Sequence, residues 1–259
     1  MKRKLYIPVL FVLLAALVLG SCDNFFSTSW GNEREYDYSN VSLSVNNLSD
    51  WLAAARGNPK LATALLKKIL ADLDGGKLSG LEKAQFQAAG VKIAIEAAGL
   101  GEAIISTASN ILDKIEAEDE EAIKDVLDKI EAELKKNTQA AHDLAGIVQG
   151  SITGGGEPTF PTDAGSYGDI VKPSEAGEAI MILTVAVLDN TAASSLDNLS
   201  DLDKNGFRIE GGKAKVADDA TPEAVALAAY LNLIAADTTG KFDSNPITGA
   251  IKKAFSLAS

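Results

Sequence analysis

The sequence predicts an all-α protein of irregular, mainly antiparallel helical hairpins, with one small β-hairpin near residues 207–216. Apolar residues recur at helical spacing from residue 46 onward, and glycine or proline separates most of these periodic stretches. Short turns between amphipathic segments favour helices that run antiparallel to their neighbours. No strict repeat of fixed length links the segments, so a regular solenoid is not predicted.

The region 46–150 is expected to form helical hairpins. Asn58-Pro59 predicts a helix start, because Asn caps the first turn and Pro fits its first position. Leucine or isoleucine then recurs at four-residue steps from Leu61 to Leu73, and Gly75-Gly76 ends the helix. The same signals predict helices at 49–56, 79–98, 104–115, 118–136 and 138–149.

The segment 151–172 interrupts this pattern with three consecutive glycines at 154–156, Pro158 and Pro161. Because it is long for a loop inside a compact domain, we expect a crossover loop or an interdomain linker. Residues 173–259 then form a second helical region, in the same domain or in another. Within it, residues 179–188 are apolar on all sides, which predicts a central helix with Leu183 fully buried.

The first residues have the pattern of an export signal. Lys2, Arg3 and Lys4 precede an apolar run at residues 5–19, and small residues follow. The run is shorter than the ~20 apolar residues that a spanning helix needs. Its ending, Leu19-Gly20-Ser21-Cys22, resembles the lipobox of bacterial lipoproteins.

That resemblance implies cleavage after residue 21, acylation of Cys22 with chains such as palmitate, and a lipid-anchored, extracytoplasmic place in the bacterial cell envelope. Residues 22–45 would be the lipidated tether. Several acyl chains anchor a protein firmly, whereas one does so weakly. The hairpin style of residues 46–149 also loosely resembles the TPR-like helical lipoproteins that accompany periplasmic transporters, although the TPR aromatic-and-glycine signature is absent.

Composition excludes several classes of function. The chain has a formal net charge of −12, and the mature form is more acidic because residues 1–21 carry three basic residues and no acidic one. Such a net charge argues against nucleic acid as a partner and against electrostatic docking on anionic lipid headgroups. Cys22 is the one cysteine, so the mature chain has neither disulfides nor a thiol nucleophile if Cys22 is acylated.

No catalytic residue is predicted, and we expect a protein that is not an enzyme. His142 is the one histidine, which leaves no His-Cys or two-histidine set for zinc or nucleophilic catalysis. Gly154-Gly155-Gly156 is followed by no Gly-Lys-Ser/Thr sequence, so a phosphate-binding loop is not predicted either.

One stretch resembles the first half of an EF-hand calcium loop. Side-chain oxygens of Asp201, Asp203 and Asn205 and the carbonyl of Phe207 occupy positions 1, 3, 5 and 7. Position 12, which needs a glutamate, is Gly212. The two hypotheses are an ordinary Asx turn and a weak calcium site, with a Kd of about 10⁻⁴–10⁻³ M. No other cofactor is expected.

These observations favour a membrane-anchored lipoprotein that works by binding. The first hypothesis is a helical scaffold for protein partners in the envelope or in transport. The alternative is a carrier that holds a small apolar molecule in a cavity between the late helices. That cavity would be bordered by the small residues of those helices, which are Ala179, Ala186, Ala226, Ala228 and Ala229.

Overall fold

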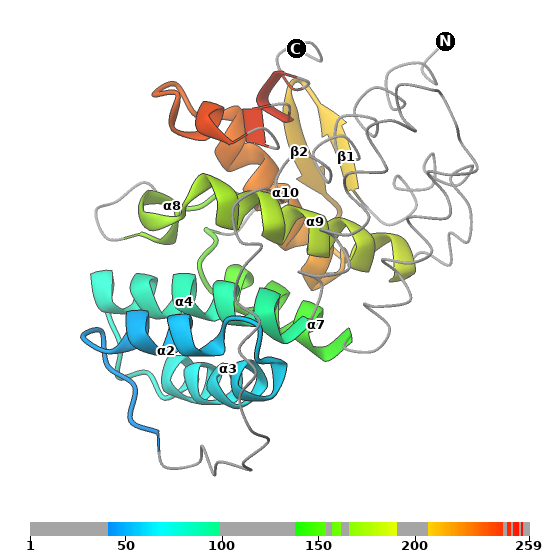
Figure 1. Ribbon diagram of the computed structural model, residues 1–259. Helices are drawn as coiled ribbons and strands as arrows, with labels where there is room; N and C mark the ends of the chain where they lie inside the picture. Colours follow the sequence, from blue (N-terminus) through cyan, green and yellow to red (C-terminus); the bar gives the residue numbers. More distant parts are fainter. Residues whose placement is uncertain are drawn as a thin grey trace, which may run out of the picture.

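A computed structural model describes residues 41–98, 138–153, 157–161, 166–190, 207–245, 248–249, 251–253 and 255. These residues are mostly helical and include one two-stranded antiparallel sheet (Figure 1), which confirms the predicted fold class. The helices predicted at 104–115 and 118–136 lie outside the described residues, as does the signal-like segment at the N-terminus.

Three helices form the N-terminal part of the described body: α2 (Leu48–Ala55), α3 (Pro59–Asp74) and α4 (Gly80–Ala98). The Asn58 side chain accepts a hydrogen bond of 3.1 Å from the Leu61 amide, so the predicted cap of α3 is confirmed. A turn follows at Gly75-Gly76, where Gly76 has a φ of 64°. This conformation suits glycine, and it lets α4 return along α3 as a hairpin.

Helix α4 lies at the centre, with α3 on one side and α7 (Thr138–Gln149) on the other. Gly90 lies where the three helices are closest. A Cβ atom at Gly90 would be 2.9 Å from Cδ1 of Ile147 and 3.1 Å from Cγ2 of Ile69. Because neither distance leaves room for a methyl group, an alanine at this position would require the side chains of Ile147 and Ile69 to move.

The segment 151–172 contributes directly to the core. A β-bridge joins Thr153 to Thr159, and the short helix α8 (Tyr167–Ile170) follows. Phe160, Tyr167 and Val171 are all buried. The glycines and prolines end helical periodicity here as expected, but the aromatic residues between them pack inward and hold the segment against the helices.

Two long helices form the C-terminal part: α9 (Pro173–Asn190) and α10 (Pro222–Ala235). The Thr221 hydroxyl accepts a hydrogen bond from Ala224 N and caps α10. Leu183 of α9 is 0% exposed, which confirms its predicted burial. After α10 come the 3₁₀ helix η3 (Lys241–Ser244) and a helical stretch within residues 248–255.

The predicted hairpin consists of β1 (Phe207–Glu210) and β2 (Lys213–Val216), with Phe207 opposite Val216 and Glu210 opposite Lys213. Its turn is Gly211-Gly212, and both residues have positive φ, as a two-residue type I′ turn requires. Strand β2 packs on α10 (Figure 1). One contiguous hydrophobic core runs through the described helices, from Leu48 in α2 to Phe255 near the C-terminus.

Candidate functional site

Two tyrosines meet inside the core, between α8 and α10. The hydroxyls of Tyr167 and Tyr230 are hydrogen-bonded to each other, and the ring of Phe160 lies 5.1 Å and 5.4 Å from their rings, centroid to centroid. Burial raises the pKa of both phenols above the ordinary value of 10. The pair therefore stays neutral, and each hydroxyl satisfies the other.

A group of carboxylates lies nearby, where α9 packs on α4. Glu175, in the first turn of α9, is buried; its Oε1 lies 3.8 Å from Lys92 Nζ, and its Oε2 accepts a hydrogen bond from Lys172 N. Glu96 of α4 accepts a hydrogen bond of 3.2 Å from Gly57 N. Both carboxylates raise the pKa of Glu178, which lies one turn beyond Glu175 on α9.

Glu178 is the group of this cluster whose protonation changes near neutral pH. Burial is the main cause that raises its pKa, to about 7, and the charges of Glu96 and Glu175 add to the effect. Lys92 and Arg56 act in the opposite direction. A carboxyl of this kind holds a proton under mildly acidic conditions and releases it above neutrality. The arrangement makes the α4–α9 contact sensitive to pH.

Asn232 of α10 connects three separate segments. Its amide oxygen accepts a hydrogen bond of 2.8 Å from Ala214 N, and its amide nitrogen donates to the carbonyls of Ala214 and Pro158. The side chain is 5% exposed. Asn232 therefore bonds to β2 as a neighbouring strand would, which satisfies backbone groups that the two-stranded sheet leaves unpaired.

Asp237 organises the chain after α10. Burial alone would raise its pKa, but hydrogen bonds from Thr239 Oγ1, Phe242 N and Lys252 Nζ hold the pKa well below its usual range. Lys252 also pairs with Asp243 at 2.9 Å. These contacts fasten the C-terminal helical stretch to η3.

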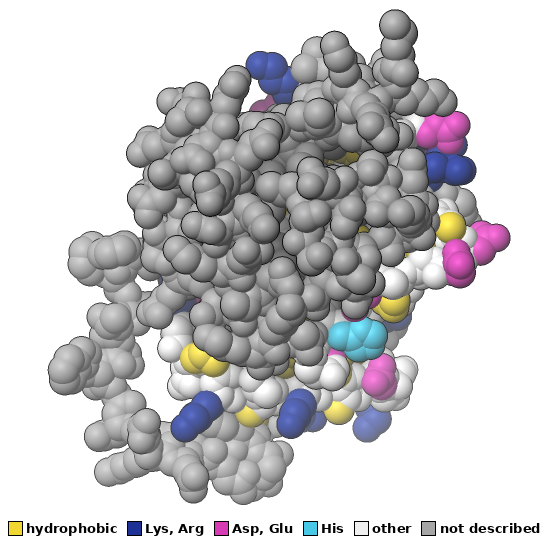
Figure 2. Space-filling model, turned by 90° about the vertical axis from the view of Figure 1, so that its right-hand side faces the viewer, with side chains coloured by type: hydrophobic (Ala, Val, Ile, Leu, Met, Phe, Trp, Pro, Cys, Tyr) yellow, Lys and Arg dark blue, Asp and Glu magenta, His cyan; other side chains and the backbone are white. Residues whose placement is uncertain are grey.

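His142 pairs with a carboxylate on another helix. Its Nδ1 lies 3.0 Å from Oε1 of Glu223, in the first turn of α10. The Glu223 side chain is 8% exposed, whereas that of His142 is 62% exposed, and Figure 2 shows the histidine ring open to solvent. The contact joins α7 to α10 across 81 residues of sequence.

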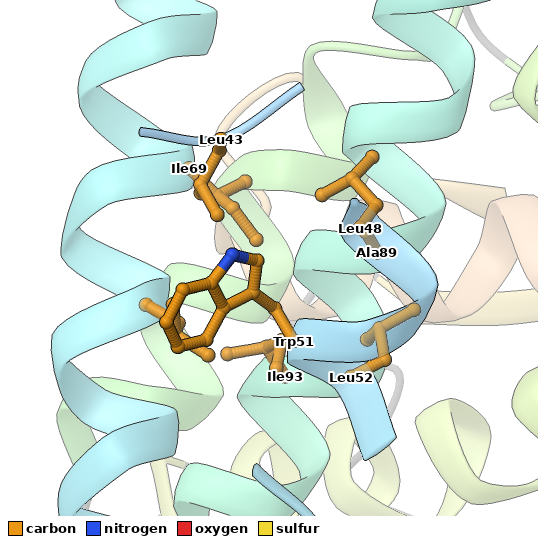
Figure 3. Close-up of a pocket in the computed structure, with 8 residues that line it drawn as sticks. Leu43, Leu48, Trp51, Leu52, Ile69, Ala89 and Ile93 are labelled. Atoms are coloured by element: carbon orange, nitrogen blue, oxygen red, sulfur yellow. The ribbon is translucent and has the colours of Figure 1, made fainter. Parts of the chain in front are cut away.

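An apolar pocket lies between α2, α3 and α4 (Figure 3). About 170 Å³ of space, part of it open solvent, lies between its lining side chains, but they leave no room for a water-sized molecule. The indole of Trp51 lies across it, and Leu43 approaches from the chain that precedes α2. The remaining lining residues are all aliphatic: Leu48, Leu52, Leu65, Ile69, Ala89 and Ile93.

Most of the predicted site residues lie outside the part of the chain that is described. These are Cys22, Asp201, Asp203 and Asn205, so acylation and the calcium loop stay predictions. Phe207 is described: it begins β1, is 4% exposed and pairs with Val216. Over the described ranges, no group of three His, Cys, Asp or Glu side chains is arranged to hold a metal ion.

No family model, no curated protein and no solved structure matches this chain. Among the helices that the structure describes, none is both long enough and apolar enough to cross a membrane.

Sequence reasoning missed the tyrosine pair, the Asn232 contacts and the Glu178 cluster. One local signal was present for Asn232, because an asparagine within the almost wholly apolar stretch 224–235 is out of place unless its amide is bonded. Tyr167 is one of two aromatic residues in the Gly- and Pro-rich segment 151–172. Nothing in the spacing indicated that it lies against Tyr230, 63 residues later.

Proposed function

We propose that this chain is a lipid-anchored, extracytoplasmic lipoprotein of the bacterial cell envelope, and that its helical body is a binding scaffold for envelope or transport partners. The observation that carries the proposal is the ending Leu19-Gly20-Ser21-Cys22 after a basic head and a short apolar run. An anchor of this kind places the body beside a membrane without a spanning helix.

The described body supports a role in binding. Polar contacts hold its elements together: Tyr167 with Tyr230 and Asn232 with β2 in the interior, and His142 with Glu223 at the surface. Within the described residues, every buried side-chain nitrogen and oxygen has a hydrogen-bond partner. A rigid body of this kind suits the presentation of surfaces to a partner.

The carrier alternative requires open space between α9 and α10. Four of the small residues on these helices, Ala179, Ala226, Ala228 and Ala229, are 0% exposed, and the two helices pack against each other. Close packing favours a filled core over a ligand cavity at these positions. Native mass spectrometry of protein purified without added lipid separates the two, because a carrier retains a small ligand and a scaffold gives the mass of the chain alone.

Anchoring is tested with radiolabelled palmitate in cells. The parent chain should incorporate label and lose residues 1–21, whereas Cys22→Ser should remain unlabelled and unprocessed. Ser21→Thr, next to the same bond, controls for general damage to export. Labelling and processing of Cys22→Ser at parental levels would refute the anchor.

A further inference from the structure

The described lysines differ in how their charge is compensated. Lys172, Lys213, Lys215 and Lys252 each lie within 4.0 Å of a carboxylate oxygen. Within the described part of the chain, the exposed lysines of α3, of the following turn and of the first turn of α4 have no ion-pair partner. These are Lys60, Lys67, Lys77 and Lys83.

These four lysines lie on one edge of the molecule. Lys60 and Lys67 are two turns apart on α3, so they share its outer face, about 10 Å apart along the axis. Lys77 and Lys83 flank the start of α4, next to the end of α3. Figure 2 shows basic side chains along the lower part of the molecule, the level at which Figure 1 places α3.

The local charge is opposite in sign to that of the whole chain. Residues 56–83 contain six basic and three acidic residues, a net charge of +3, whereas the complete chain has −12. The acidic residues of this stretch are Asp72, which Lys68 neutralises at 2.8 Å, and the exposed Asp74 and Glu82. The net charge of the whole chain argues against docking on anionic lipid, but this stretch forms a basic edge on an otherwise acidic protein.

Exposed apolar side chains accompany the lysines. Leu81 is 52% exposed, in the first turn of α4 between Lys77 and Lys83, and Val45 is 36% exposed just before α2. These two are the large hydrophobic residues that the described part of the chain leaves exposed. Basic residues around an inserted leucine are typical of surfaces that rest in the interface of a bilayer.

The described chain begins beside α3. Leu43 packs into the pocket formed with Leu65 and Ile69 of α3. Val41 is only 19 residues after Cys22, and a chain of that length reaches at most about 65 Å when fully extended. An acyl chain on Cys22 would therefore keep α3 within that distance of a membrane, where the basic edge can reach the lipid surface.

We propose that the edge formed by Lys60, Lys67, Lys77, Lys83 and Leu81 docks on the anionic phospholipid surface to which the chain is anchored. Docking would fix the orientation of the body and turn the acidic C-terminal part away from the lipid. The proximity argument rests on the proposed anchor at Cys22, whereas the charge and exposure of the edge do not depend on it.

The test uses the full chain, with its processing intact, incorporated into vesicles. A Leu81→Cys variant carries an environment-sensitive nitrobenzoxadiazole label, and two vesicle types are compared: pure phosphatidylcholine, and phosphatidylcholine with about a third of phosphatidylglycerol. Docking should raise the emission of the label and shift it to the blue in the anionic vesicles alone. High salt should abolish the response, because it screens exposed charges.

A matched pair of variants locates the effect. One surface-bound basic residue is worth about fivefold in the docking equilibrium. Lys60→Gln with Lys67→Gln and Lys77→Gln should therefore weaken docking at least tenfold. The control, Arg208→Gln with Lys213→Gln and Lys215→Gln, removes the same charge from the β-hairpin and should leave docking unchanged. Circular dichroism checks the fold of each variant. If the triple-lysine variant does not fold, the salt response of the parent chain tests the docking proposal instead.

Equal emission in both vesicle types, or an equal loss in the control variant, would overturn the proposal; an acidic protein would then be the better partner for this edge. The parent chain is labelled in parallel, because Cys22 is its one thiol. Label on Cys22 would show that the anchor has failed. Docking is then measured by co-sedimentation of the Cys22→Ser chain with the same vesicles. Failure of the anchor is therefore distinguished from failure of the basic edge to dock.

Discussion

In the N-terminal region, residues 41–98, four exposed lysines have no ion-pair partner among the described residues. In the C-terminal region, residues 157–255, four lysines lie within 4.0 Å of a carboxylate, and Lys241 donates to the carbonyls of Gly168 and Asp169. The four are Lys172, Lys213, Lys215 and Lys252. The interiors differ as well. Helices α2, α3 and α4 meet mainly through aliphatic side chains, whereas α8, α10 and the hairpin meet through Tyr167, Tyr230 and Asn232.

This difference teaches that the two regions reach their fold by different routes. Aliphatic contacts are non-directional, so they tolerate small shifts of α2 and α3. Hydrogen bonds between buried groups require defined distances and angles, so they hold α10, β2 and the loop at Pro158 in one arrangement. Charge left uncompensated on the first region is available to a partner, while charge in the second is used within the chain.

The largest effect should come from the apolar core that both regions share. Leu65→Ala and Leu183→Ala should each lower the free energy of unfolding by about 2–5 kcal/mol, because both side chains are at most 1% exposed. Urea denaturation measures this, with Leu81→Ala as the exposed control at about 0.5 kcal/mol or less. A loss at Leu183 alone would show that the regions unfold separately.

Next is the polar contact of the C-terminal region. Asn232→Leu keeps the size of the side chain but leaves Ala214 N, Ala214 O and the Pro158 carbonyl without their partner. We expect a loss of about 1–3 kcal/mol. Amide exchange at Ala214 should become faster, while amides of α3 keep their protection. Unchanged exchange at Ala214 would refute the role of Asn232 in holding β2.

Glu178 lies on α9 of the C-terminal region, which packs on α4 of the N-terminal region, and its effect on the free energy of unfolding depends on pH. Its pKa in the folded chain, about 7, lies above the ordinary 4.5, so the folded state binds the proton more readily than the unfolded state. This contribution to stability is therefore fully present below pH 4.5, is lost as the pH rises to about 7, and stays absent above.

Glu178→Gln removes that dependence. We expect the variant to gain about 1–2 kcal/mol over the parent at pH 8 and little at pH 4.5, after allowance for solvent screening. Urea denaturation at both pH values measures the gain. The pKa of Asp237 is lowered in the folded chain, so its contribution to stability is lost only as the pH falls below about 4. It therefore does not affect the comparison between pH 4.5 and pH 8. Equal gains at the two pH values would contradict the interpretation.

The smallest effects should separate paired from unpaired lysines. Lys67→Gln should change the free energy of unfolding by less than about 0.5 kcal/mol, because its side chain is exposed and outside any described ion pair. Lys252→Gln should lower the Tm more than Lys67→Gln does, since the Lys252 side chain is 24% exposed and lies 3.1 Å from Asp237 and 2.9 Å from Asp243. Thermal denaturation of the two variants side by side provides the comparison.

The parts of the fold that sequence predicts well are those set by neighbouring residues. Asn58-Pro59 begins α3 as expected, and the predicted hairpin turns at Gly211-Gly212, because caps and turns depend on a few adjacent side chains. The continuous apolar run 179–188 likewise predicted the burial of Leu183.

Contacts between distant segments could not be predicted in this way. Asn232 meets Pro158 across 74 residues, and Gly57 meets Glu96 across 39. The raised pKa of Glu178 results from burial and from charges on two helices, neither of which its own neighbours in sequence indicate. Counting charges over the whole chain also hid the basic edge, because a sum carries no information about position.

The tyrosine pair gives the molecule two natural optical reporters. Both tryptophans, Trp30 and Trp51, precede α3, whereas Tyr167 and Tyr230 lie in the C-terminal region, which has no tryptophan. Among the described residues, Trp51 therefore reports on the N-terminal part and the tyrosine pair on the C-terminal part, without any introduced label. Since one core connects these parts, the tyrosine and tryptophan signals should change at the same denaturant concentration.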